Sequence, residues 1–339
     1  MIRIGDLELS GPFVLASMSE ISTPPARLLA RQHGSAMAWT PMISAELLQS
    51  GDAETEKLAR VVPGEEPVGL QVVGASEEDL SASAGRAAGL GFQAVDLNAS
   101  CPVRRIRSKG AGSALMKDPS RLGACVGAMR AATELPLTVK LRLGETRESM
   151  NYAECASAAV DSGADGVTLH ARTVDDSYLV GAHWEHVWRL AAECDLGVPV
   201  GGSGSVWTAE DAVRLLAESK CDYVAVGRGA TGNPWVFAEA EALFAGREKP
   251  EPPTPQEVAE TMRRHFEMLV DREGEATACR LMRSLGPAYL ERVEGSEVAV
   301  ATMRGVETAE ALDAICSLVA LAGTDDEETG KGGGEGGGH

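Results

Sequence analysis

What the 339-residue sequence lacks excludes several classes of protein. No stretch of about 18 apolar residues free of charge occurs, so we expect no membrane span. The first ten residues contain no basic region followed by an apolar run, so we expect no secretory signal. The seven cysteines include no CxxC pair, and their spacing fits neither a zinc site nor a disulfide framework. We therefore expect a cytoplasmic protein that binds no metal.

Aromatic residues and lysine are also scarce. Aromatics make up 4% of the chain against 44% hydrophobic residues, so the core must consist mostly of Ala, Val and Leu. The 31 basic residues, mostly arginine, face 50 acidic ones and give a net charge of −19. This balance argues against a nucleic-acid-binding protein. It is also typical of the acidic surface of a salt-adapted protein, on which a local basic patch can persist, so RNA binding stays open.

Eight short apolar runs alternate with longer segments rich in Ala, Leu, Glu and Arg, such as 77–90, 119–132, 152–162 and 209–218. Eight β-then-α units in about 245 residues match a (β/α)₈ TIM barrel. A doubly wound sheet is the alternative, but no Rossmann glycine fingerprint follows the first run. The expected strands are residues 12–17, 35–40, 68–74, 94–100, 137–143, 166–171, 198–204 and 223–229.

A proline-rich segment, PEPPTP at 250–255, disfavours a continuing helix and indicates a linker. From 256 to 322, apolar residues recur at three- and four-residue spacing, which predicts helices throughout. The remaining chain is acidic and then glycine-rich, a composition typical of disorder. We expect a barrel domain over 1–246, a helical domain over 247–322 and a disordered tail over 323–339.

Side-chain alternation along four consecutive predicted strands indicates a shared polar site. Because neighbouring residues face opposite sides of a strand, the aliphatic side must meet the outer helices. The polar side then points into the barrel near the carboxyl ends of the strands, where such barrels build active sites. Buried polar groups need partners, and a bound polar ligand or contacts among themselves would both serve. The inward residues are Gln71, Asn98, Lys140 and His170.

Glycines follow the seventh and eighth predicted strands, at 201–204 and 227–229. Glycine lets backbone N–H groups approach an anion, and Arg228 could pair with one. Loops after strands seven and eight often hold a phosphate in this fold, although a tight turn would use the same residues. With the inward polar set, these loops predict a phosphorylated cofactor at the barrel mouth. FMN fits, with Lys140 near its ring.

Four sequence blocks resemble those of one enzyme family. LNASCPVRRIRSKGAGSALMKDP at 97–119 is similar to the segment around the catalytic cysteine of the tRNA-dihydrouridine synthases. VKLRLG at 139–144, LHART at 169–173 and VGRGATGNPWVF at 226–237 follow in the family's order. The similarity extends from about residue 12 to 244, and the helical region lies where the family has its own. We therefore identify the chain as a divergent member.

The resemblance implies reduction of uridine to 5,6-dihydrouridine in tRNA. Reduced FMN, recharged by NADPH or NADH, would pass a hydride to C6, and Cys101 would donate a proton to C5. An ordinary thiol pKa near 8.5 keeps a cysteine protonated at neutral pH. Asn98 and Arg172 would contact the uracil region. FMN would be held by Gln71, Lys140, His170, Gly202, Ser203, Gly227 and Arg228.

Basic residues follow Cys101 at 104, 105, 107 and 109. Charge runs are usually solvated loops, but beside a catalytic cysteine Arg104 and Arg105 are expected to contact tRNA phosphates. The other six cysteines are expected to be buried core residues.

Several positions depart from the family pattern, and most lie on the substrate side. Residues 282–289 lack two basic groups of the usual MRKHxxWY block. Two other functions remain open: an FMN-dependent dehydrogenase or reductase of a free pyrimidine, since NASCP occurs there too, and a non-catalytic RNA-binding paralogue. At the remaining departures, Thr23 replaces an acidic residue, Ala26 replaces Phe and Pro41 replaces Glu. Ser203 and Ser205 replace Asn and Asp.

Overall fold

The computed structural model describes residues 2–322. The chain divides into two compact units. The first contains the chain up to Ala230 together with Pro234–Lys249, and the second contains Thr231–Asn233 and the chain from Pro250 onward. The expected domain boundary at 246/247 lies just before this division. The expected disordered tail at 323–339 lies outside the described residues.

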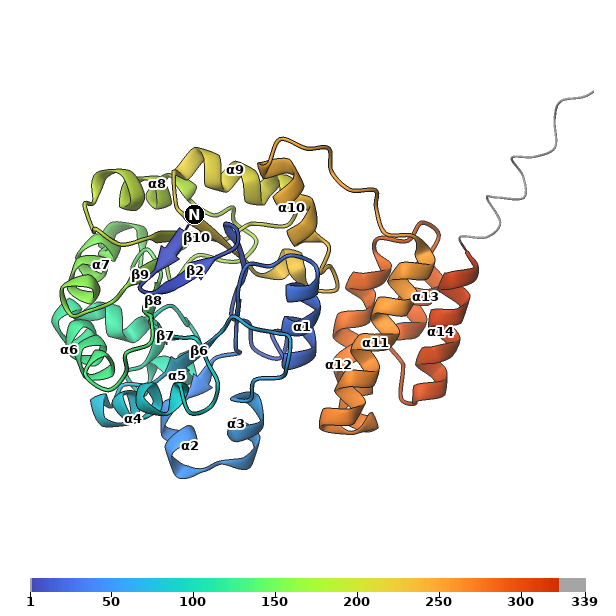
Figure 1. Cartoon of the computed structure of the whole chain (residues 1–339), viewed down its shortest axis with the longest axis horizontal. Coiled ribbons are helices and arrows are strands. Elements are labelled where there is room, and N and C mark those ends of the chain that lie inside the picture. The colour runs from blue at the N-terminus through green and yellow to red at the C-terminus, as the bar shows by residue number, and fades with distance from the viewer. Residues whose placement is uncertain (1, 323–339) are drawn as a thin grey trace, which may run out of the picture. The chain divides into compact units, whose positions relative to one another are not determined.

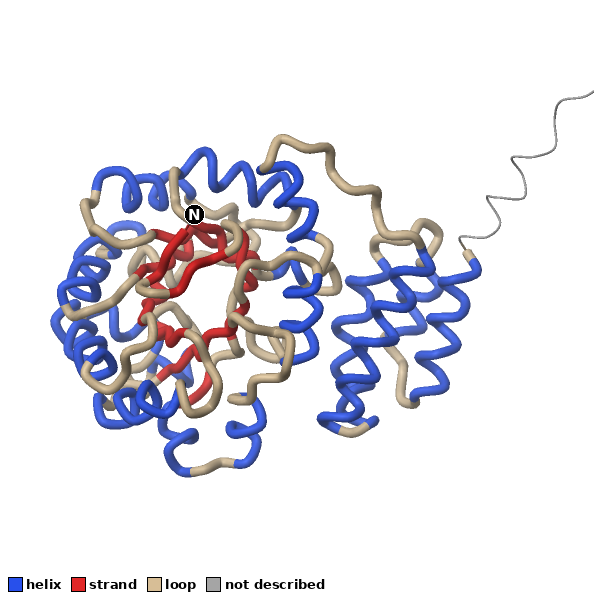
Figure 2. The backbone as a smooth tube through the Cα atoms, in the orientation of Figure 1, coloured by secondary structure: helices blue, strands red, loops and turns tan. Residues whose placement is uncertain are grey.

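The first unit is a closed parallel barrel, which confirms the predicted fold (Figures 1 and 2). Each predicted apolar run contains one barrel strand, and the first of these strands pairs with the eighth, which closes the barrel. A short strand, β5 (Ile43–Ser44), also pairs with β6. The eight strands are β3 (Phe13–Leu15), β4 (Ala38–Trp39), β6 (Val68–Val73), β7 (Ala94–Asn98), β8 (Leu137–Leu141), β9 (Gly166–His170), β10 (Val200–Ser203) and β11 (Tyr223–Val226).

Helices surround the strands, as the blue ring around the red strands in Figure 2 shows. Their starts are specified locally, because side chains such as Ser76 and Asp118 accept hydrogen bonds from the first-turn N–H groups. Thr208 and Asp211 form a capping box at the start of α9. The main helices of this unit are α1 (Pro24–Gln32), α2 (Ala45–Ser50), α3 (Ala53–Leu58), α4 (Glu77–Ala87), α5 (Arg104–Arg107), α6 (Pro119–Arg130), α7 (Tyr152–Asp161), α8 (Trp184–Glu193), α9 (Ala209–Ser219) and α10 (Val236–Phe244).

The aliphatic face of each strand packs against these helices. Helix residues such as Leu80 and Val126 belong to the same core cluster as the strand residues. The alternation predicted from the sequence is therefore confirmed, and it turns the opposite residues inward. The outward strand residues, all fully buried, include Leu70, Val72, Val95, Leu97, Val139, Leu141, Val167 and Leu169.

An N-terminal hairpin that we did not predict packs on the barrel interior. It consists of β1 (Ile2–Ile4) and β2 (Leu7–Leu9), paired antiparallel. Ile4 and Leu9 form a core cluster with inward side chains such as Trp39 and Tyr223. These apolar side chains fill the amino-terminal part of the barrel interior. The polar residues at the carboxyl ends of the strands therefore line a cavity that is closed on that side.

The second unit consists of α11 (Pro255–Glu273), α12 (Glu275–Leu290), α13 (Glu297–Met303) and α14 (Ala309–Leu321). The predicted helices of this region are confirmed. Pro255 occupies the first turn of α11, and a capping box of Thr254 and Glu257 starts that helix. None of the helices within residues 2–322 has the length and apolar character needed to cross a membrane.

Candidate active site

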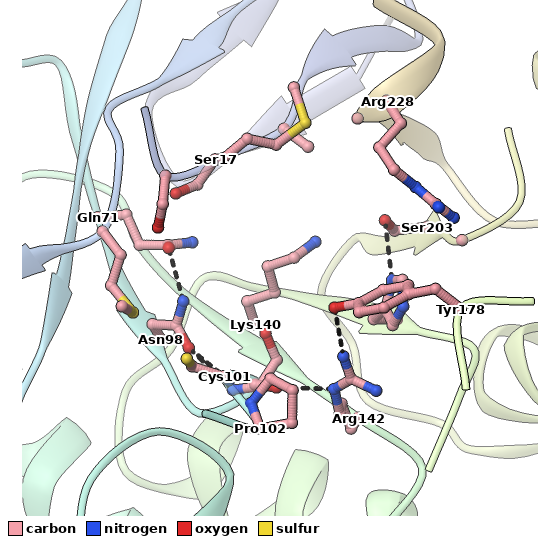
Figure 3. Close-up of a pocket in the computed structure, with 18 of the residues that line it drawn as sticks. Ser17, Gln71, Asn98, Cys101, Pro102, Lys140, Arg142, Tyr178, Ser203 and Arg228 are labelled. Carbon is pink, nitrogen blue, oxygen red and sulfur yellow. Dashed lines mark hydrogen bonds between the residues drawn. The ribbon is translucent and has the colours of Figure 1, made fainter. Parts of the chain in front are cut away.

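A cavity of about 370 Å³ opens at the carboxyl ends of the barrel strands. It contains side chains from nearly every strand end, so residues distant in the sequence meet there (Figure 3). The predicted residues that line it are Gln71, Asn98, Cys101, Lys140, His170, Ser203, Gly227 and Arg228.

Cys101 is held at the edge of the cavity by its own loop. Its backbone N–H donates to Asn98 Oδ1 at 2.9 Å, and its carbonyl accepts from Ser113 N at 3.0 Å. Gly112 has a φ of +59°, and a Cβ there would lie 2.8 Å from the Cys101 oxygen, so only glycine allows this approach. Burial raises the pKa of the Cys101 thiol, which keeps the proton on sulfur.

A chain of hydrogen bonds runs from this loop into the barrel interior. Asn98 Nδ2 donates to Gln71 Oε1 at 2.7 Å, and Gln71 Nε2 donates to Asp96 Oδ2 at 2.8 Å. The second oxygen of Asp96 accepts from Thr138 Oγ1 at 2.6 Å. In its ionised form Asp96 only accepts, and it then fixes which way both amides point. Burial raises the pKa of Asp96 to about 7, against the lowering effect of these donors and of Lys140.

Lys140 projects into the cavity beside this chain (Figure 3). Within residues 2–322 its ammonium takes part in no hydrogen bond or ion pair, although Asp96 lies near enough to affect it electrostatically. Burial lowers the pKa of Lys140 to about 8, and Asp96 opposes that shift. A partly buried cation without a hydrogen-bonding partner indicates a site for a ligand that carries negative charge.

The surroundings of His170 favour its neutral imidazole form. Burial, and then the positive charges of nearby arginines and Lys140, hold its pKa well below the ordinary value. Its Nε2 lies 3.5 Å from Arg172 Nη1, and its Nδ1 lies 3.5 Å from Ser203 Oγ. Because Arg172 can only donate, the tautomer that suits both neighbours has Nε2 as the acceptor and the hydrogen on Nδ1, toward Ser203.

Residues 14–321 match the model of a single family, described as dihydrouridine synthase (Dus). The chain belongs to the dihydrouridine synthase family. A probable tRNA-dihydrouridine synthase of Mycobacterium tuberculosis is 34% identical over 334 residues, which cover 95% of this chain and 85% of that protein. The tRNA-dihydrouridine synthase B of Pseudomonas aeruginosa is 30% identical over 298 residues, which cover 87% of this chain and 89% of that protein.

A solved structure is also similar to the chain. A crystal structure of mandelate oxidase with (S)-2-phenylpropionate has a TM-score of 0.47 and 20% identity, and the match covers 72% of this chain and 73% of that one. Membership in the dihydrouridine synthase family follows from the family model and the sequence relatives.

Two of the residues that the family resemblance selected lie outside the cavity lining. A Cβ added to Gly202 would contact Cys221 Sγ and Val187 Cγ1, both at 3.2 Å, so this position faces the outer helices while Ser203 faces inward. Arg172 is fully buried, and its Nη2 donates to Val180 O and Ser205 Oγ, both at 2.7 Å. A cofactor contact of Gly202 and a substrate contact of Arg172 stay predictions.

The basic residues after Cys101 differ in their environments. Arg107 pairs with Glu145, and Lys109 pairs with Glu46 at 2.6 Å. Arg104 and Arg105 lie exposed on α5, and neither forms an ion pair within the described part of the chain. Of the four cations, these two therefore keep their charge available to a substrate.

Several lining residues were missed by the sequence reasoning. Arg142 donates through Nε to Ser100 O at 2.8 Å and through Nη2 to Tyr178 Oη at 2.9 Å. It shares its strand face with Lys140, so the alternation could have identified it. Tyr178 comes from the loop after β9 and Met18 from the loop after β3, and neither had a periodic signal.

The lining fits a flavin phosphate cofactor by the chemistry of its donors. Lys140 and Arg228 present positive charge, and the Arg228 guanidinium forms no hydrogen bond to any residue of 2–322. Gly227 lies against Met18 Sδ, 3.3 Å from where its Cβ would be, so a side chain there would crowd the cavity. Lys140 and Arg228 would hold the negative charges that a reduced flavin and its phosphate would bring to this cavity.

No group of three or more His, Cys, Asp or Glu side chains that could hold a metal ion occurs within residues 2–322.

Proposed function

We propose that this chain reduces uridine to 5,6-dihydrouridine in tRNA, with FMN as its cofactor and NADPH as the source of electrons. The observation that carries the proposal is the cavity in which Cys101, Lys140 and His170 meet at the barrel mouth of a dihydrouridine synthase family member. Relatives named tRNA-dihydrouridine synthase match along most of this chain and support the choice of substrate.

FMN in its reduced form would supply the hydride that adds to C6 of the uracil ring. Cys101 then donates its proton to C5, so that the C5–C6 double bond becomes two C–H bonds and a single bond. The thiolate left behind takes a proton from solvent. Arg142 lies near enough to lower the pKa of Cys101, so its charge stabilises that thiolate while it forms.

The other polar residues have binding roles in this proposal. Lys140, His170 and Gln71 hold the flavin ring, and Lys140 offsets the negative charge of the reduced form. Ser203, Gly227 and Arg228 hold the phosphate, and Gly202 supports that loop. Asn98 and Arg172 orient the uracil, and Arg104 and Arg105 bind RNA phosphates.

The test begins with the visible absorption spectrum of the purified protein and identification of any released chromophore. Protein charged with FMN is then incubated with NADPH and unmodified transcribed tRNA, and dihydrouridine is measured by mass spectrometry. We expect the flavin bands, released FMN, and dihydrouridine that depends on both FMN and NADPH. Free uracil and dihydroorotate serve as competing substrates.

Turnover of a free pyrimidine in place of tRNA would replace the proposed substrate while keeping the flavin. A protein that binds no FMN at all would end the proposal and favour a non-catalytic RNA-binding role.

A further inference from the structure

Trp207 is a large apolar residue that lies 48% exposed beside the cavity, in the loop between β10 and α9. The Arg228 guanidinium carbon lies 4.1 Å from the centroid of its indole ring. Tyr178, itself half-exposed, has its ring centroid 5.0 Å from the same carbon. Figure 3 shows the Arg228 side chain directed toward Tyr178 and Ser203. Two aromatic rings from different loops thus contact one guanidinium.

The backbone holds these loops close together. A Cβ added to Gly229 would lie 2.7 Å from both Val206 O and Trp207 O, so any larger residue would push the Trp207 loop away from Arg228. The backbone N–H of Trp207 donates to Asp211 Oδ2 at 3.0 Å, which ties the same loop to the start of α9. The contact between Trp207 and Arg228 is therefore built into two anchored loops.

Stacking leaves the hydrogen-bonding capacity of Arg228 unused. A ring contacts the face of a guanidinium, whereas its five N–H donors lie in the plane. The Arg228 guanidinium forms no hydrogen bond within residues 2–322, yet Arg228 lines the cavity beside Ser203 and Gly227. Ordering an arginine side chain costs rotamer entropy, and stacking against the two rings orders Arg228 before a ligand arrives.

The surrounding charge also indicates an anion. Arg142 and Arg172 lie 5.6 Å and 5.5 Å from the Tyr178 ring, so three guanidiniums surround one tyrosine. The negative faces of Tyr178 and Trp207 offset part of their mutual repulsion. A bound phosphate would offset more of this repulsion, and its three acceptor oxygens suit donors that lie in one plane.

We propose that Trp207 and Tyr178 form an aromatic clamp that holds Arg228 ready for a phosphate, and that this clamp selects a phosphorylated flavin over riboflavin. The inference deepens the proposed function, on which its choice of ligand rests. Trp207 is a positioning residue in this scheme, because it acts on the phosphate only through Arg228.

The experiment compares FMN with riboflavin, which have the same ring and differ in the phosphate. Flavin-free protein is titrated with each ligand, with flavin fluorescence as the signal, for the wild type, W207L and W207F. Leucine keeps apolar bulk without a quadrupole, whereas phenylalanine keeps an aromatic face. F244L is the matched control, since Phe244 is also about half exposed but does not line the cavity.

We expect W207L to weaken FMN binding by about two- to fivefold, the range of an exposed cation–π contact, with riboflavin affinity unchanged. W207F should recover most of the FMN affinity, and F244L should change neither ligand. An equal loss for both flavins, or none for FMN, would overturn the clamp.

Inorganic phosphate serves as a second probe that separates this inference from the proposed function. If the wild type bound neither flavin, the proposed function would fail. Phosphate binding that W207L weakens and W207F restores would then still support the clamp. If phosphate also failed to bind, or bound equally to every variant, the clamp would be wrong.

Discussion

At the scale of single residues, Cys101 differs from the other cysteines in its surroundings. Five of the other six cysteines are buried, as expected of core residues: Cys125, Cys155, Cys221, Cys279 and Cys316. The expectation is wrong for Cys194, which is partly exposed and packs at the edge of the core without lining the cavity. Cys101 is partly exposed, lines the cavity and is fixed by Asn98 and Ser113. Its loop therefore presents a protonated thiol to whatever occupies the barrel mouth.

Replacing Cys101 by alanine tests its role as an acid. We expect tRNA-dependent reoxidation of the dithionite-reduced flavoprotein to slow by about 10² to 10⁴, the usual contribution of general acid catalysis. Binding of FMN should not change, because the resemblance gives Cys101 no cofactor contact. Rapid-mixing absorbance in the flavin bands measures the step, and C101S is the conservative comparison. Unchanged reoxidation in C101A would remove the thiol from the mechanism.

The pH dependence of the same step follows from the raised pKa of Cys101. An acid works while it is protonated, so the rate is kept below its pKa and lost as the pH rises through it. Because burial raises this pKa, the midpoint of the decline should lie above pH 8.5, the ordinary thiol value. A decline centred below pH 8.5 would contradict the buried, protonated thiol.

At the scale of elements, α11 and α12 are joined by a buried polar contact. His265 Nδ1 lies 3.0 Å from Tyr289 Oη, and both side chains are buried. Burial lowers the pKa of His265 to about 4. The Nε2 atom of this histidine has no hydrogen-bond partner within residues 2–322, so a proton added there would be a buried, unsatisfied charge.

This histidine should make the helical unit sensitive to acid. The unfolded imidazole binds a proton below about pH 6.5, whereas the folded one does so only near pH 4, so protons stabilise the unfolded state in between. The contribution of neutral, buried His265 to the free energy of unfolding is fully present above pH 6.5. Between pH 6.5 and pH 5 we expect a loss of about 2 kcal/mol in the free energy of unfolding.

The measurement is urea unfolding followed by circular dichroism at the two pH values, for the wild type and H265Q. Glutamine keeps hydrogen-bonding groups but does not titrate, so the difference between the two proteins isolates His265 from the carboxylates. Equal pH dependence in both would mean that His265 is protonated in the folded unit.

At the scale of the whole molecule, a net charge of −19 opposes binding to RNA unless cations are gathered in one place. Near Cys101, the basic residues divide into two paired with acids and two, Arg104 and Arg105, that are exposed without an ion pair in the described chain. An RNA phosphate can reach the second pair without breaking an existing ion pair.

Removing both charges in R104A/R105A should therefore weaken tRNA binding and make it less dependent on salt. Each lost phosphate contact is expected to reduce the slope of log K against log salt by about 0.7 to 0.9. Fluorescence anisotropy with labelled tRNA at several salt concentrations measures both. The control R3A/K220A removes two exposed cations elsewhere on the barrel unit. Equal slopes in the two double variants would exclude Arg104 and Arg105 as phosphate contacts.

The sequence alone determined the barrel and most of the inward residues of its site. Side chains alternate with a period of two along any strand. Because Val139 and Leu141 face the outer helices, Lys140 between them must face the barrel interior. His170 and Asn98 followed from the same rule. The family blocks then added Cys101, whose loop has no periodicity to interpret.

Only the tertiary structure decided which residues from irregular segments join that site. Tyr178 and Trp207 reach Arg228 from loops whose paths depend on packing between distant strands. A loop has no repeating geometry, so its side-chain directions are fixed by contacts that form only when the barrel closes.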